Sequence, residues 1–153
     1  MSKHAVFWIR DDFRIKNNPA LSYATNNHEC VSAIYIYNNL KFDQKREAQK
    51  WWISKSLTEF GKDLQKYNIN LEIFNSDEIN FFSKINKEKD LSVYWNKIYE
   101  PEELDIDKKL ISFFEKKKIN FKFFKGNVLN EFNKVNKNDG TPFKVYSPFW
   151  RNV

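Results

Sequence analysis

The stretch Ala5-Val6-Phe7-Trp8-Ile9-Arg10-Asp11-Asp12-Phe13-Arg14 decides the fold of this chain. Five apolar residues run without a break and stop at four charged residues within five positions. An unbroken apolar run is typical of a strand that is buried on both faces of a parallel sheet. The charges then lie at the carboxyl end of the strand, which is the edge where open α/β sheets bind ligands. A buried strand followed by a solvated charged loop would give the same pattern.

Strands and helices alternate along the rest of the chain. Further apolar runs at 30–37, 71–74, 91–95 and 119–124 predict four more strands. The longest helix is expected at about Lys45 to Tyr67, where apolar residues recur at spacings of four and three. Asn18-Pro19 and Pro101 are typical helix starts. This alternation predicts a Rossmann-like α/β fold, with a doubly wound, five-stranded parallel sheet of order 3-2-1-4-5 and helices on both faces.

In this order the first and fourth strands are neighbours, so the loops Arg10 to Arg14 and Asn96 to Glu103 face one crevice. The chain has only three glycines, and none lies in the loop directly after the first strand. Neither the dinucleotide fingerprint nor the P-loop pattern occurs, and a dehydrogenase or an NTPase is therefore disfavoured. No G-x-S-x-G elbow is present, so an α/β-hydrolase nucleophile is not supported. Glu100, Glu102 and Glu103 could be acid–base groups, although acids in the first turn of a helix are more often structural.

Composition limits the classes of partner. The 26 basic and 20 acidic residues give a net charge of +6, and because both signs are mixed, nucleic-acid contact is permitted without being indicated. His4 and His28 lack metal-ligand spacing, so no metal site is expected. Cys30 is the only cysteine and is expected to be a small core residue. With neither a signal peptide nor a long apolar run, the protein is expected to be cytoplasmic, without a membrane partner.

The last stretch, Gly140 to Trp150, is unusual for the end of a domain. It combines four aromatic residues with two prolines, which disfavour a helix or a central strand. These large apolar groups should pack on the domain's own surface or lead into a second domain. We expect a domain at 1–130 and the start of a linker at 131–153.

Four motifs carry a resemblance to the DNA photolyase/cryptochrome family. In chain order they are Phe7 to Ile15 with Asn18 to Leu21, Lys45-Arg46 with Trp51-Trp52 and Ser56-Leu57, Val93 to Asn96 with Tyr99-Glu100-Pro101, and Gly140 to Phe143 with Val145 to Trp150. The chain departs from the family pattern after Glu100-Pro101. Arginines are common there, whereas this chain has Leu104 and Ile106 beside Asp105 and Asp107.

The resemblance implies the amino-terminal light-harvesting domain of a deoxyribodipyrimidine photolyase, a lyase that uses light and FAD to split pyrimidine dimers in DNA. FAD and the catalytic residues would lie in a helical domain beyond this chain, which would be the partner in cis; ultraviolet-damaged DNA would be bound by the full-length protein. A cryptochrome-type blue-light receptor domain and a stand-alone α/β nucleotide-binding module are the alternatives.

The resemblance further implies an antenna pigment in this domain, either methenyltetrahydrofolate or 8-hydroxy-5-deazaflavin. We expect the crevice to bind it through Arg10, Tyr37, Asn38, Trp95, Asn96, Glu100 and Glu103. Trp95 and Tyr37 would form an apolar wall, a carboxylate would accept from ring N–H groups, and Arg10 would pair with an anionic ring oxygen. Alternatively, Arg10 forms a structural ion pair with Glu100 or Asp12 and no ligand binds.

Overall fold

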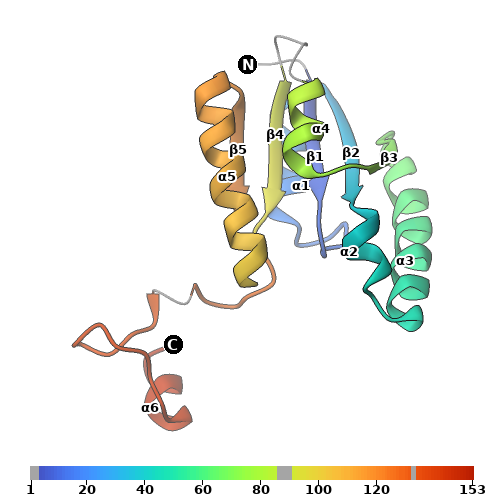
Figure 1. Cartoon of the computed structure of the whole chain (residues 1–153). Coiled ribbons are helices and arrows are strands. Elements are labelled where there is room, and N and C mark those ends of the chain that lie inside the picture. Colours follow the sequence, from blue (N-terminus) through green and yellow to red (C-terminus); the bar gives the residue numbers. More distant parts are fainter. Residues whose placement is uncertain (1–3, 86–90, 132–133) are drawn as a thin grey trace.

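The computed structural model describes residues 4–85, 91–131 and 134–153 and contains one parallel sheet (Figure 1). The strands are β1 (His4–Ile9), β2 (Cys30–Tyr37), β3 (Leu71–Asn75), β4 (Leu91–Asn96) and β5 (Asn120–Phe124). Their order is β3-β2-β1-β4-β5, and every pairing is parallel. The predicted fold and strand order are confirmed, and β1 lies between β2 and β4 as expected.

Helices cover both faces of the sheet. They are α1 (Pro19–Asn27), α2 (Asn39–Asp43), α3 (Glu47–Gln65), α4 (Glu78–Ile85), α5 (Pro101–Lys117) and α6 (Tyr146–Trp150). Buried residues of α1 and α3 form one core cluster with the sheet, and those of α4 and α5 form the other. In Figure 1, α4 and α5 lie in front of the sheet and α1 lies behind it.

β1 is buried on both faces because its side chains alternate between the two clusters. Phe7 points into the α1 and α3 cluster and is 1% exposed, whereas Trp8 points into the α4 and α5 cluster and is 2% exposed. Trp8 packs edge to face on Phe82 of α4, with ring centroids 5.6 Å apart. Helices on both sides therefore explain the unbroken apolar run in the sequence.

The predicted helix starts are correct. The Asn18 side chain accepts a hydrogen bond from the Leu21 backbone N–H at 3.1 Å, and Pro19 is the first residue of α1. Pro101 likewise begins α5. Because Asn18 is fully buried, this cap also fixes how α1 joins the end of β1.

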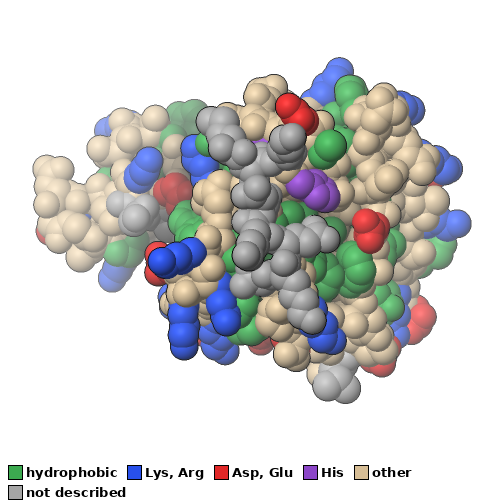
Figure 2. Space-filling view, turned by 90° about the horizontal axis from the view of Figure 1, so that it is seen from above, with side chains coloured by type: hydrophobic (Ala, Val, Ile, Leu, Met, Phe, Trp, Pro, Cys, Tyr) green, Lys and Arg blue, Asp and Glu red, His purple; other side chains and the backbone are tan. Residues whose placement is uncertain are grey.

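Cys30 differs from the expectation, because it is exposed rather than part of the core. It is the first residue of β2 and lies at the amino-terminal edge of the sheet, beyond the buried part of the strand. Figure 2 looks onto this edge, where basic and acidic side chains are interspersed. A strand's apolar run can therefore begin outside the layer that its helices cover.

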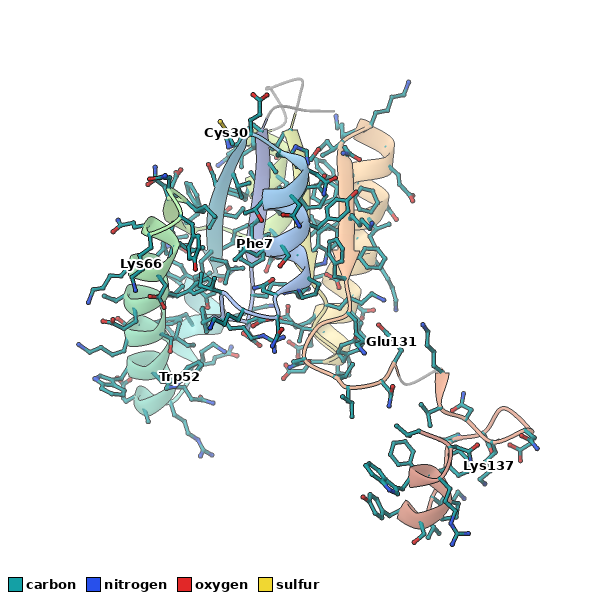
Figure 3. The ribbon with its side chains drawn as sticks, turned by 180° about the vertical axis from the view of Figure 1, so that it is seen from behind. Phe7, Cys30, Trp52, Lys66, Glu131 and Lys137 are labelled. Atoms are coloured by element: carbon teal, nitrogen blue, oxygen red, sulfur yellow. The ribbon has the colours of Figure 1, made fainter. Side chains whose placement is uncertain are left out.

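The chain leaves the sheet after β5 and ends in a separate lobe (Figures 1 and 3). Val145, Tyr146 and Trp150 are all more than half exposed in this lobe. A cavity of about 460 Å³ lies between Leu129 and the rings of Phe143 and Phe149. The tail thus does not return to the apolar layers of the sheet.

No helix in the described ranges is long and apolar enough to cross a membrane.

Candidate functional site

Arg10 is the central charged group at the carboxyl edge of the sheet. It directly follows β1 and is only 7% exposed. One terminal nitrogen donates to Asp107 Oδ1 at 2.6 Å and the other donates to the carboxylate of Glu103. The guanidinium carbon lies 4.7 Å from the centre of the Trp8 ring. Because both acids belong to α5 and are four residues apart, one helix face supplies both partners.

Asp107 also ties β4 to this network. The indole N–H of Trp95 donates to Asp107 Oδ1 at 3.1 Å, so that carboxylate accepts from residues on two neighbouring strands. Burial raises the pKa of Asp107, whereas Arg10 and the Trp95 N–H oppose the rise. Arg10 thus forms a buried ion pair, but its partners are Asp107 and Glu103 rather than the expected Glu100 or Asp12.

A second network joins β4 to the start of α1. The Asn96 side-chain amide donates to Asn18 at 2.8 Å and to Asp12 at 3.2 Å, while its oxygen accepts from the Ala20 N–H at 3.1 Å. Asp12 is also bound by Arg14, at 2.7 and 3.0 Å. The buried Asn96 side chain therefore links β4 to the start of α1, and its amide nitrogen and oxygen are already hydrogen-bonded within the protein.

A cavity of about 130 Å³ opens at the carboxyl ends of β1 and β2. Five of the expected binding residues line it together: Arg10, Tyr37, Asn38, Glu100 and Glu103. Sequence reasoning missed several others, namely Trp8, Asp11, Tyr35, Lys41, Lys45, Glu78 and Ile98. α2 follows β2 directly and brings Lys41 to the rim, 3.8 Å from Glu103.

The other two expected residues lie elsewhere. Asn96 lines a neighbouring cavity of about 220 Å³ with Asp12, Arg14 and Gly126. Trp95 lines neither of these two cavities, because it is fully buried, with Phe121 stacked at a ring-centroid distance of 5.9 Å. Trp8 contributes to the walls of both. The aromatic wall expected at Trp95 is thus present at its cross-strand partner Trp8.

Several carboxylates line the first cavity and influence the pKa values of their neighbours. Asp11 lies at the exposed rim, where partial desolvation raises its pKa, and the charge of Glu103 adds to this rise, while Lys45 and Arg10 oppose it. Burial, together with Asp11 and Glu103, raises the pKa of Tyr35 to about 12. The site can therefore offer hydrogen-bond acceptors, whereas its guanidinium is already paired. Within the described part of the chain, no three His, Cys, Asp or Glu residues are grouped to hold a metal ion.

Some of the site residues that sequence reasoning missed do carry a signal in the sequence, and others do not. Asp107 interrupts the apolar face of α5 three residues before the buried Leu110, and such a carboxylate needs a buried partner. Its spacing of four from Glu103 places both acids on one side of the helix. No comparable signal marks Trp8, since every residue of its strand segment is apolar.

Comparisons with known proteins point to one family and cover nearly the whole chain. The family model described as DNA photolyase matches residues 5–153. A deoxyribodipyrimidine photo-lyase of Agrobacterium fabrum is 29% identical over 147 residues, which cover 95% of this chain and 30% of that protein.

Solved structures agree. A class III photolyase from Agrobacterium tumefaciens superposes with a TM-score of 0.87 at 27% identity and covers 99% of this chain and 31% of that one. A Sulfolobus tokodaii photolyase with two FAD molecules shares the fold, with a TM-score of 0.80 at 22% identity, over 98% of this chain and 34% of that one. A Synechocystis cryptochrome also shares the fold, with a TM-score of 0.81 at 19% identity, over 98% of this chain and 33% of that one. This chain spans about a third of the length of these relatives. It belongs to the DNA photolyase family.

Proposed function

We propose that this chain is the amino-terminal light-harvesting domain of a deoxyribodipyrimidine photolyase. In this proposal a helical domain binds FAD and repairs pyrimidine dimers in DNA, and this domain passes excitation energy to that flavin. The observation that carries the proposal is the crevice at the carboxyl ends of β1 and β2, where five expected residues meet in a chain of this family. Identity of 29% with a photo-lyase favours this function over a cryptochrome, whose 19% identity supports the fold alone.

The domain organisation is part of the same proposal. Residues 1–130 form the α/β domain and residues 131–153 begin the linker to the helical domain. Two observations support this division: the relatives are about three times as long as this chain, and Tyr146 and Trp150 are exposed in the lobe that leaves the sheet. Sequencing the gene downstream of Val153 tests it, and a stop codon directly after that residue would contradict it.

The chemistry of the crevice favours the folate over the deazaflavin. Both terminal nitrogens of Arg10 are bound by carboxylates, which leaves this guanidinium poorly placed to take up an anionic ring oxygen. Glu103, Glu100 and Asp11 instead offer acceptors to N–H groups and suit a cationic methenyl bridge. Since small-molecule sites span roughly 300–1,000 Å³, the cavity of about 130 Å³ admits one ring system. The rest of the pigment would lie over the rim beside Lys41.

Titration of the purified chain with methenyltetrahydrofolate and with 8-hydroxy-5-deazaflavin, followed by visible and near-ultraviolet absorbance, tests this assignment. We expect the folate to bind more tightly, and Glu103→Gln to weaken it about 10-fold or more through loss of a charge-assisted hydrogen bond. Glu100→Gln should weaken binding without disturbing the Arg10 network. Glu102→Gln is the matched control, because Glu102 is exposed on the first turn of the same helix and does not line the cavity.

Two outcomes would contradict the assignment. Tighter binding of the deazaflavin would show that the site accepts an anionic ring despite its carboxylates. Folate binding that is equally tight in Glu100→Gln, Glu103→Gln and Glu102→Gln would show that the crevice is not the site. Thermal unfolding of each variant separates loss of a ligand contact from loss of the fold.

A further inference from the structure

The outer face of α3 exposes two adjacent tryptophans. Trp51 is 63% exposed and Trp52 is 54% exposed. The apolar side of this helix is already defined by Leu57, Phe60 and Leu64, which are buried against the sheet. Single exposed apolar residues are ordinary on protein surfaces, whereas two exposed indoles within one turn of a helix call for an explanation.

Helix geometry places a cation between the two indoles. Lys55 follows Trp52 by three residues and Trp51 by four, so it lies next to both on the helix surface. The Trp52 ring is held in place by Phe13, with centroids 5.7 Å apart and planes at 68°. Figure 3 places Trp52 near one end of α3 and Lys66 at the other.

The surrounding segment is basic. Residues 41–55 contain five Lys or Arg and two Asp or Glu, a net charge of +3, which is half of the chain's net charge of +6. Among the described residues, Arg46 and Lys55 make no ion pair. Other lysines of this segment and of α3 are paired: Lys41 with Glu103 at 3.8 Å, Lys50 with Glu47 at 3.0 Å, and Lys62 with Glu59 at 2.7 Å.

We propose that Trp51, Trp52 and Lys55, which we name the tryptophan patch, bind single-stranded nucleic acid, with other cations of residues 41–55 around them. Bases stack on exposed aromatic rings without regard to sequence, and flanking cations neutralise the phosphates. An apolar protein surface suits the patch less well, because it would bury the Lys55 ammonium between the indoles without a counter-ion. The proposal requires neither a pigment nor a flavin and goes beyond the light-harvesting function.

Fluorescence anisotropy with a labelled oligothymidylate of about 12 nucleotides, a length within the usual site size, tests the proposal on the purified chain. We expect binding at about 50 mM salt that weakens roughly 5- to 20-fold at 200 mM, as two or three phosphate contacts require. Trp51→Ala with Trp52→Ala should weaken binding at least about 10-fold. Lys55→Ala should weaken it less and flatten the salt dependence.

Matched controls come from other exposed positions. Trp150→Ala removes an indole that is 60% exposed in the terminal lobe, and Lys108→Ala removes a lysine from the outer face of α5. Both should leave the affinity unchanged. Absence of binding at 50 mM salt, or equal losses in the Trp150→Ala control, would overturn the proposal. So would a tryptophan double variant that keeps its affinity but changes the oligomeric state in light scattering, since the patch would then join copies of this chain.

Discussion

The two ends of the central strands are built from different chemistry. At the amino end, a His28 ring nitrogen and the Tyr94 hydroxyl are 2.7 Å apart, and the Asn120 side chain donates to Ser92 at 2.8 Å. At the carboxyl end, a buried guanidinium, that of Arg10, lies between two carboxylates of α5. Imidazole, amide and hydroxyl groups thus close one end, whereas formal charges are buried at the other.

This difference indicates that the amino end only links the strands, whereas the carboxyl end is built to bind a ligand. Amide and hydroxyl pairs link strands at a modest cost in desolvation, whereas burying ions costs several kcal/mol per ion in the absence of partners. Apolar residues could close the carboxyl end at least as stably. We infer that the charges remain there because the crevice uses them: Asp107 and Glu103 both hold Arg10, and Glu103 also lines the cavity.

The largest expected effect is at Arg10. Arg10→Met should lower the free energy of unfolding by about 3–5 kcal/mol, because it leaves the buried Asp107 carboxylate without its counter-ion. Urea denaturation followed by circular dichroism measures the loss. Adding Asp107→Leu should recover part of the loss, since replacing both partners of a buried pair by apolar residues is often neutral, whereas the buried Trp95 indole N–H loses its acceptor.

Arg14 provides the matched control for this experiment. It also pairs with a carboxylate, that of Asp12, but the Arg14 side chain is 48% exposed, so Arg14→Met should cost less than about 1 kcal/mol. Equal losses at Arg10 and Arg14 would remove the distinction between buried charge and surface charge on which the comparison rests.

A second expected effect concerns the backbone at the carboxyl edge. A Cβ at Gly126 would overlap the carbonyl oxygen of Lys97, so Gly126→Ala should destabilise the fold by about 1–3 kcal/mol. Gly61→Ala is the control of opposite sign. There the new Cβ would make an ordinary contact with Leu71, and helix propensity should leave stability unchanged or raise it by up to about 1 kcal/mol. Thermal unfolding should therefore show a lower midpoint for Gly126→Ala and no loss for Gly61→Ala.

Much of the carboxyl edge could be predicted because topology alone brings β1 beside β4. Asn18-Pro19 and Pro101 then fixed where α1 and α5 begin. The partners of Arg10 could not be predicted in the same way. Several acids follow Pro101, and the rotation of α5 on the sheet decides that Glu103 and Asp107, rather than Glu100, reach the guanidinium.

The face of each strand residue was also beyond sequence reasoning. In a strand covered on both sides, apolar residues occupy both faces, and alternation therefore gives no signal. Trp8 and Trp95 are direct partners across the sheet, yet only Trp8 borders the two cavities beside Arg10. Sequence patterns locate such strands but cannot say which ring a ligand would meet.

A smaller effect is expected at the amino end. Tyr94→Phe removes the hydroxyl that interacts with His28 and should lower the free energy of unfolding by about 1 kcal/mol, the net value of one hydrogen bond. Tyr67→Phe is the control, because Tyr67 is 62% exposed, and surface changes usually stay within about 0.5 kcal/mol. A loss at Tyr94 as large as that at Arg10 would mean that both ends depend equally on their polar groups.

The smallest expected effect depends on pH and concerns Asp11. Partial desolvation and the charge of Glu103 raise the pKa of Asp11 in the folded state above its ordinary value of 3.8. A group with a raised folded-state pKa costs stability once it ionises, so the cost grows as the pH rises from 3.8 through the folded-state pKa and is constant above it. Asp11→Asn should therefore raise the unfolding midpoint at pH 7, and the gain should disappear as the pH falls toward 3.8.

Asp105 supplies a control of opposite sign for this measurement. Its hydrogen bond with Lys108 lowers the pKa of Asp105 below 3.8. A carboxylate with a lowered folded-state pKa adds stability above 3.8, and this stability is lost as the pH falls through the folded-state value. Asp105→Asn should therefore lower the midpoint at pH 7. If Asp11→Asn also lowers the midpoint at pH 7, or if its gain is unchanged near pH 4, the Asp11 charge is stabilised by Lys45 and Arg10, and the crevice is less negative than its lining implies.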